Sequence, residues 1–95
     1  MKIMTTWSAK SGEGFTEAVR RFLAGQAAAP ECVKILGRWH SVDVSTGFTL
    51  YETDNAAAFY AGAAVWADLL DLKSYMVIED SEAGPVLTNL ANLRK

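Results

Sequence analysis

The sequence predicts a single α+β domain with a four-stranded antiparallel sheet and three helices. Its 95 residues suffice for one hydrophobic core and are too few for two. Hydrophobic residues make up 51% and charged residues 21%, a composition typical of globular chains and not of disordered ones. Short segments rich in β-branched and aromatic residues alternate with segments of helical periodicity. The order of these segments is β-α-β-β-α-β-α.

The first strand is predicted from Lys2 to Ser8, where Ile, Met, Thr and Trp follow one another. Ser11 is a suitable N-cap for the helix that follows. The apolar positions of this helix lie on one stripe: Phe15, Ala18, Val19, Phe22 and Leu23. Gly25 is placed where a helix of this length would end.

The second and third strands are predicted at Val33–His40 and Phe48–Thr53. The segment between them, Asp43–Gly47, is rich in turn-forming residues, so the two strands form a hairpin. Simple alternation along the second strand would place Val33, Ile35 and Trp39 on one face. It would place Arg38 and His40 on the other face.

A second helix is predicted at Ala56–Ala67, with Asp54 or Asn55 as its cap. Phe59, Ala63 and Trp66 recur on it at helical spacing. A fourth strand at Leu72–Glu79 follows.

The last helix is predicted to begin at a capping Asp80 or Ser81. Pro85 then has to lie in its first turn, where the missing N–H is harmless. The apolar stripe of this helix consists of Val86, Leu87, Leu90 and Leu93.

The first six elements match the ferredoxin-like βαββαβ plan, with one extra C-terminal helix. Right-handed crossovers place the first and third strands at the centre of the sheet and the others at its edges. Large side chains occupy both faces of these strands, although helices cover only one face. We therefore expect the second face to pack against another copy of the chain, as a two-fold homodimer.

Four segments, KIMTTWS, VKILGRWH, GFTLYETDN and VWADLLDLK, resemble the bacterial domain of unknown function 3303 family. The most specific parts of the resemblance are Gly37–His40 and Trp66–Leu70. The family is similar in plan to the dimeric α/β-barrel superfamily. The resemblance implies one ferredoxin-like domain over residues 1–95, whose sheet packs on that of its mate. It implies no activity. From the residues themselves we expect no cofactor.

Several classes of function are disfavoured by composition. A net charge of −2 argues against binding to nucleic acid. The single cysteine, Cys32, cannot form an intrachain disulfide, and with one histidine the sequence shows no metal-ligand spacing. The most apolar stretch, Ala56–Leu70, is too short for a membrane span and the N-terminal segment lacks a secretory signal. We expect a cytoplasmic protein without a membrane partner.

Three residues are candidates for catalysis. His40 is the lone histidine, Arg38 lies two positions before it, and Glu52 lies on the neighbouring strand. Together they could move a proton or bind an anion. The competing interpretation, which we favour, is that His40 is a structural residue at a strand end or dimer contact.

Five aromatic residues are candidates for ligand binding: Trp7, Trp39, Tyr51, Trp66 and Tyr75. They could line a pocket between sheet and helices, or simply pack in the core. Ser41, Asp43 and Ser45 near His40 are better explained by turn chemistry than by a catalytic triad. Asp68 is expected to have a structural role.

Three functions are compatible with these features. The first is a homodimeric domain that binds a small, partly apolar ligand or serves as an accessory module. The alternative is a cofactor-independent enzyme of the monooxygenase, isomerase or cyclase type, with His40 in proton transfer. A purely structural interaction domain is a third reading. The residues alone leave open whether the protein is an enzyme.

Overall fold

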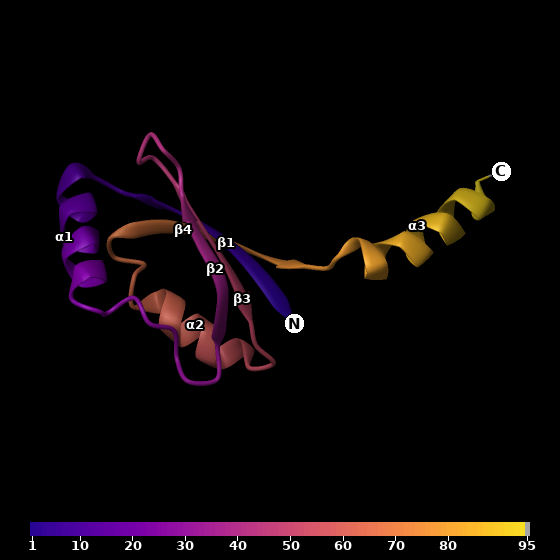
Figure 1. Ribbon diagram of the computed structural model, residues 1–95, viewed down its shortest axis with the longest axis horizontal. Coiled ribbons are helices and arrows are strands. Elements are labelled where there is room, and N and C mark those ends of the chain that lie inside the picture. The colour runs from indigo at the N-terminus through magenta and orange to yellow at the C-terminus, as the bar shows by residue number, and fades with distance from the viewer. Residues whose placement is uncertain (95) are drawn as a thin grey trace.

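The computed structural model describes residues 1–94 and contains seven helices and strands within them (Figure 1). In chain order these are β1 (Lys2–Ala9), α1 (Gly12–Leu23), β2 (Lys34–His40), β3 (Gly47–Glu52), α2 (Ala56–Ala64), β4 (Leu70–Val77) and α3 (Asp80–Leu93). The sheet has the order β2-β3-β1-β4, and every neighbouring pair is antiparallel. The predicted ferredoxin-like topology, with the first and third strands at the centre, is confirmed.

The helices α1 and α2 lie on one side of the sheet, whereas α3 projects away from it (Figure 1). This projection makes the molecule elongated, with extents of 54 × 30 × 19 Å. An ion pair between Lys2 and Glu79 joins the start of β1 to the residue before α3. Beyond this point α3 runs free of the sheet in the ribbon view. No helix within residues 1–94 has the length and apolar character needed to cross a membrane.

Local signals at the ends of α1 and α2 are as the sequence predicts. The Ser11 hydroxyl accepts a hydrogen bond from the Gly14 backbone N–H at 3.0 Å, and Asn55 Oδ1 accepts one from Ala58 at 3.0 Å. Each bond satisfies one of the unpaired N–H groups of a helix start. Gly25 follows α1 with a φ of 79°, the left-handed conformation that ends helices and suits glycine.

The start of α3 differs from the prediction. Its N-cap is Glu79, which makes no side-chain capping bond, and neither Asp80 nor Ser81 is the cap. Pro85 lies inside the helix, past the first turn, so the backbone carbonyl of Ser81 has no N–H partner there. Pro85 therefore interrupts the hydrogen bonding within α3 and does not mark the start of the helix.

The faces of β2 also differ from the prediction, because a bulge lies between Ile35 and Gly37. Ile35 pairs with Tyr51 and Arg38 pairs with Thr49, so both of these β2 residues face the helices. Simple alternation had put them on opposite faces. Trp39 pairs with Phe48 and faces outward.

The hydrophobic core is small. Within residues 1–94 the buried hydrophobic side chains are Ile3, Val33 and Leu70, together with the buried threonines Thr5, Thr49 and Thr53. By contrast, the stripe of α1 that faces the sheet stays about two-fifths exposed: Phe15 at 43%, Val19 at 40% and Phe22 at 42%. Because α1 does not pack closely on the sheet, a space remains between them.

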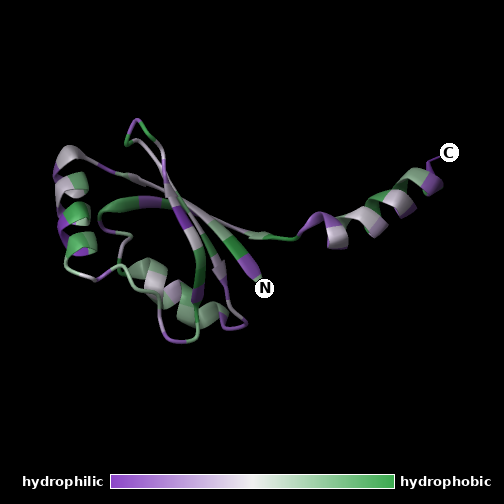
Figure 2. Ribbon diagram, in the orientation of Figure 1, coloured by the Kyte–Doolittle hydropathy of each residue, from purple (hydrophilic) through white to green (hydrophobic). Residues whose placement is uncertain are grey.

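Apolar side chains are also exposed on the opposite face of the sheet and along α3. On the outer sheet face they are Trp39, Phe48 and Tyr75. On α3 they are Val86, Leu87, Leu90 and Leu93. The hydropathy colouring shows hydrophobic positions along the projecting helix (Figure 2). The uncovered sheet face is mixed, because the register places Lys34, Glu52 and Lys73 on it beside these apolar side chains.

Candidate functional site

A cavity of about 170 Å³ lies between the inner face of the sheet and the helices α1 and α2. Cavities of roughly 150 Å³ lined by apolar side chains hold benzene-sized molecules. Its walls are mainly apolar and include aromatic rings from β1, β3, both helices and the turn after α2: Trp7, Phe15, Phe22, Tyr51, Phe59 and Trp66. Tyr51 and Phe59 meet edge to face, with ring centroids 5.2 Å apart. This space has the size and lining of a site for a small ring compound.

Polar groups on the floor of the cavity are paired with one another. Trp7 Nε1 donates to Thr49 Oγ1 at 3.1 Å, and Thr5 shares a hydrogen bond of 2.8 Å with Ser74. Such pairing removes the free-energy penalty of burying these groups. It also fixes the indole ring of Trp7, which forms one wall of the cavity.

Arg38 and His40 bring positive charge and an imidazole to the edge of this apolar space. Arg38 Nη2 donates to the backbone carbonyl of Ala27 at 2.9 Å, and its guanidinium lies 5.5 Å from the centroid of the Phe22 ring. The His40 ring meets Trp7 and Phe22 edge to face, at centroid distances of 5.3 and 6.0 Å. Both residues line the cavity.

The structure thus brings together five of the eight residues singled out from the sequence: Trp7, Arg38, His40, Tyr51 and Trp66. The other three, Glu52, Trp39 and Tyr75, do not line the cavity. Glu52 pairs in register with Lys2 and Lys34, at the end of the sheet away from His40. Strand alternation places it on the outer face, so a proton relay from Arg38 and His40 to Glu52 is not formed.

Phe15, Phe22 and Phe59 line the cavity but were assigned from the sequence only to helix stripes. Their helical spacing in the sequence indicates that they face the sheet. Spacing carries no information on how far a helix stands from the sheet. The sequence could therefore identify these side chains as inward-facing, but not as cavity walls.

Asp43 takes part in a turn and not in a triad. Its Oδ1 accepts hydrogen bonds from Ser41 Oγ at 2.8 Å, Ser45 Oγ at 2.7 Å and the Ser45 backbone N–H at 3.1 Å. These bonds, with that of the Ser45 hydroxyl largest, lower the pKa of Asp43 from 3.8 to about 2. Oδ1 of this carboxylate thus closes the β2–β3 hairpin.

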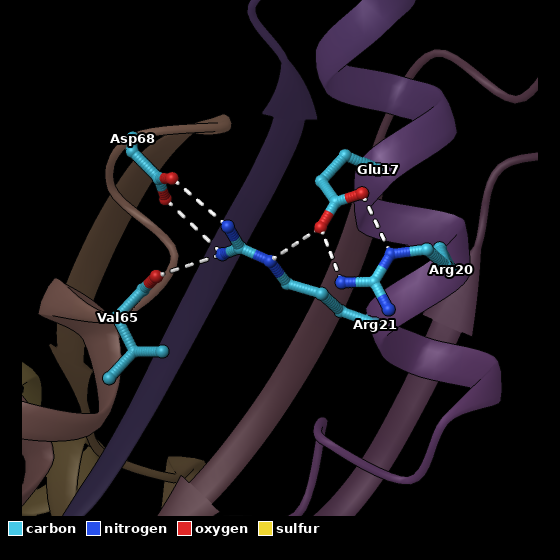
Figure 3. Close-up of polar contacts among 5 residues, drawn as sticks. All are labelled: Glu17, Arg20, Arg21, Val65 and Asp68. Atoms are coloured by element: carbon cyan, nitrogen blue, oxygen red, sulfur yellow. Dashed lines mark hydrogen bonds and ion pairs between the residues drawn. The ribbon is translucent and has the colours of Figure 1, made fainter.

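Asp68 has the structural role expected of it. Arg21 Nη2 binds Asp68 Oδ2 at 3.1 Å, and Arg21 Nη1 donates to the Val65 carbonyl at 3.2 Å (Figure 3). The same guanidinium lies 5.8 Å from the centroid of Trp66, a wall of the cavity. These contacts join α1 to the turn between α2 and β4. Within residues 1–94 there is no cluster of three or more histidine, cysteine, aspartate or glutamate side chains that could hold a metal ion.

Comparison with known protein families agrees with the resemblance seen in the sequence. No curated protein matches the chain. Among solved structures, the chain is similar to a protein from Deinococcus radiodurans described as a candidate antibiotic biosynthesis monooxygenase. The TM-score is 0.48 and the identity 18%, over 83% of this chain and 94% of that chain. The family model described as "Domain of unknown function (DUF3303)" matches residues 1–91, nearly the whole chain. The chain therefore belongs to the DUF3303 family.

Proposed function

We propose that this protein is a homodimeric domain that binds a small, partly apolar ligand in the cavity between the sheet and the helices α1 and α2. The observation that carries the proposal is the unfilled space beside α1. The apolar side chains of a helix that face a sheet are usually buried, but here they are not. Phe15, Val19 and Phe22 keep about two-fifths of their surface exposed although they face the sheet. A ligand that covered these surfaces would gain the free energy of apolar burial, about 25 cal/mol per Å².

The homodimer is supported by two uncovered apolar surfaces. The outer sheet face exposes Trp39 at 54% and Tyr75 at 55%, and α3 exposes Leu87 at 61%. A helix of 14 residues without tertiary packing is marginal in water, so α3 needs a surface on which to lie. A second copy offers such a surface, because two-fold pairing of the sheets would bring each α3 close to its mate. The exposed Cys32 has no disulfide partner, which suits the reducing cytoplasm.

Tryptophan side chains provide a direct test of the ligand site, because they lie on different faces. Trp7 and Trp66 line the cavity, whereas Trp39 lies on the outer face. Titration of the ¹⁵N-labelled protein with the neutral aromatic 2-naphthamide should shift the indole N–H signals of Trp7 and Trp66 and leave that of Trp39 in place. If the signals of Trp7 and Trp66 stay unchanged at millimolar probe, the ligand site is wrong.

A cofactor-independent enzyme is the second candidate, and it is favoured by one observation. His40 lies at the rim of the cavity between the Trp7 and Phe22 rings, so an imidazole nitrogen is within reach of a bound molecule. In such a reaction His40 would take a proton from the bound substrate. The test is turnover of oxidisable or enolisable aromatic substrates by the protein and by His40→Gln. Activity that survives His40→Gln unchanged would exclude this role.

A further inference from the structure

We propose that the ligand of the cavity is a small aromatic carboxylate, with its carboxylate paired to Arg38 and its ring among the aromatic walls. This inference rests on the proposed function, since it names the ligand class of the same site. It depends on where Arg38 lies, what holds it, and what charges surround it.

The bulge in β2 is what brings Arg38 to the cavity. Because the bulge lies between Ile35 and Gly37, Arg38 pairs with the buried Thr49 and faces the helices. On a regular strand it would lie on the face opposite Ile35. Bulges redirect a side chain, and here the redirected side chain is a half-buried guanidinium.

Arg38 is held in place by neutral groups only. One N–H bonds to the Ala27 carbonyl, and the Phe22 ring covers the guanidinium at 5.5 Å. Every ion pair found within residues 1–94 uses another cation: the N-terminus, Lys2, Arg20 or Arg21. A guanidinium carries five N–H donors in a fork that fits a carboxylate. Arg38 thus presents a fixed positive charge that no acid in the described part of the chain neutralises.

The charged side chains that line the cavity have one sign. Among the residues that line it, Arg38 is the one with a permanent charge, His40 lies beside it, and neither aspartate nor glutamate is present. Glu52, the acid that the sequence suggested as a partner, lies on the outer face of the sheet. An anion is therefore attracted to this rim, and a cation is repelled.

The remaining walls select the body of the ligand. Trp7, Phe59 and Trp66 present flat apolar surfaces to a space of about 170 Å³. Aromatic rings stack favourably in such surroundings, and a space of this size admits a small ring compound. Arg38 at the edge of a cavity with aromatic walls therefore fits a planar aromatic acid better than an aliphatic, sugar or phosphate ligand.

The experiment compares 2-naphthoate with its neutral near-isostere 2-naphthamide and with the cation 2-naphthylmethylammonium, on the full-length protein. Indole N–H shifts of Trp7 and Trp66 report binding in the cavity. We expect 2-naphthoate to bind at least about tenfold more tightly than the amide, the usual gain from a charge-assisted pair. The cation should bind most weakly.

Variants assign the preference to one side chain. Arg38→Gln should reduce the affinity for 2-naphthoate about tenfold or more and change that for the amide less than about threefold. Arg38→Lys should retain part of the preference, because it keeps the charge and loses the fork. Lys34→Gln, on the same strand but the outer face, should change nothing. An unshifted Trp39 signal in each variant shows that the fold is intact.

The outcomes separate the two proposals. Equal binding of acid and amide in the wild-type protein would overturn the carboxylate assignment and leave the apolar ligand site standing. Shifts at Trp39 alone, or no shift with any probe, would overturn both. The comparison of ligands in the wild-type protein needs no variant, so the inference can be tested even if Arg38→Gln does not fold.

Discussion

Arg21 on α1 binds Asp68, which follows α2, through two contacts of 3.1 and 3.4 Å (Figure 3). The pair thereby joins α1 to the turn between α2 and β4. Glu17 Oε1 accepts a hydrogen bond of 3.3 Å from Arg21 Nε. The pair lies 47 positions apart in the sequence, so it constrains tertiary structure and not only one helix.

Breaking this pair should loosen α1. In Arg21→Gln the backbone amides of α1 and of residues 65–69 should exchange faster with deuterium, because the bond between the two segments is lost. The control is Arg20→Gln, whose side chain bonds only to Glu17 of its own helix. Hydrogen exchange measured by mass spectrometry checks the difference. Equal exchange in the two variants would show that Arg21 does not hold the helices together.

Acidification should weaken the ion pairs of Glu17 on α1. Arg20, and then Arg21, lower the pKa of Glu17 from 4.5 to about 2, so the folded state favours the carboxylate. A lowered pKa contributes stability above the unfolded value, and this contribution is lost as the pH falls from about 4.5 towards 2. Glu17→Gln should therefore show a shallower loss of thermal stability over this window than the wild type does. A carboxyl NMR titration of Glu17 with a midpoint near 4.5 would contradict the argument.

The hairpin turn gives an independent acid-sensitive site. Hydrogen bonds from Ser45 and Ser41 lower the pKa of Asp43 from 3.8 to about 2, so its contribution is lost as the pH falls through this range. Asp43→Asn should flatten the pH dependence of amide exchange at Ser45 and Thr46, with no effect on α1. A change in α1 instead would mean that the turn and the helix are coupled.

Gly47 at the start of β3 should tolerate no side chain. A Cβ at this position would overlap the indole ring of Trp7, which lies directly across the β1–β3 pair. Gly47→Ala should cost about 1–3 kcal/mol in the free energy of unfolding, since the ring has to move and its bond to Thr49 is strained. Urea unfolding measures this cost. Gly12→Ala, where nothing lies within 4 Å of the added methyl group, is the control and should change stability by less than about 0.5 kcal/mol.

The sequence predicts the topology well and the site only in part, for identifiable reasons. The caps of α1 and α2 depend on local residues, Ser11 and Asn55, which the sequence displays directly. The strand order follows from the sequence of elements and the handedness of their crossovers. The face of Arg38 depends on a bulge that hydrophobic alternation does not reveal. The fit of Trp7 over Gly47 depends on register between distant strands. The local residue pattern therefore predicts the helices and strands. The cavity depends on the bulge in β2 and on the distance between the helices and the sheet, which that pattern does not contain.

The outer sheet face should carry the dimer contact. Phe48 lies on an inner strand of the sheet and pairs with the exposed Trp39. Phe48→Lys should raise the dimer dissociation constant at least about tenfold, or roughly 1.4 kcal/mol, because it would place a charge in an apolar contact. Analytical ultracentrifugation measures the constant. Val42→Lys, in the fully exposed hairpin loop, is the control and should leave it unchanged. A wild-type protein that is monomeric at micromolar concentration would contradict the homodimer itself.

The projecting helix α3 should fold by docking its apolar stripe on the second copy. Leu90 lies in the middle of that stripe, and Thr88 lies on the opposite side of the helix. Leu90→Glu should weaken dimerisation and increase amide exchange throughout α3, since the helix is marginal without a partner. Thr88→Glu introduces the same charge away from the stripe and should do neither. If α3 exchanges fast in the wild-type dimer and Leu90→Glu has no effect on association, the helix does not dock on the mate. In that case the dimer would rest on the sheet face alone.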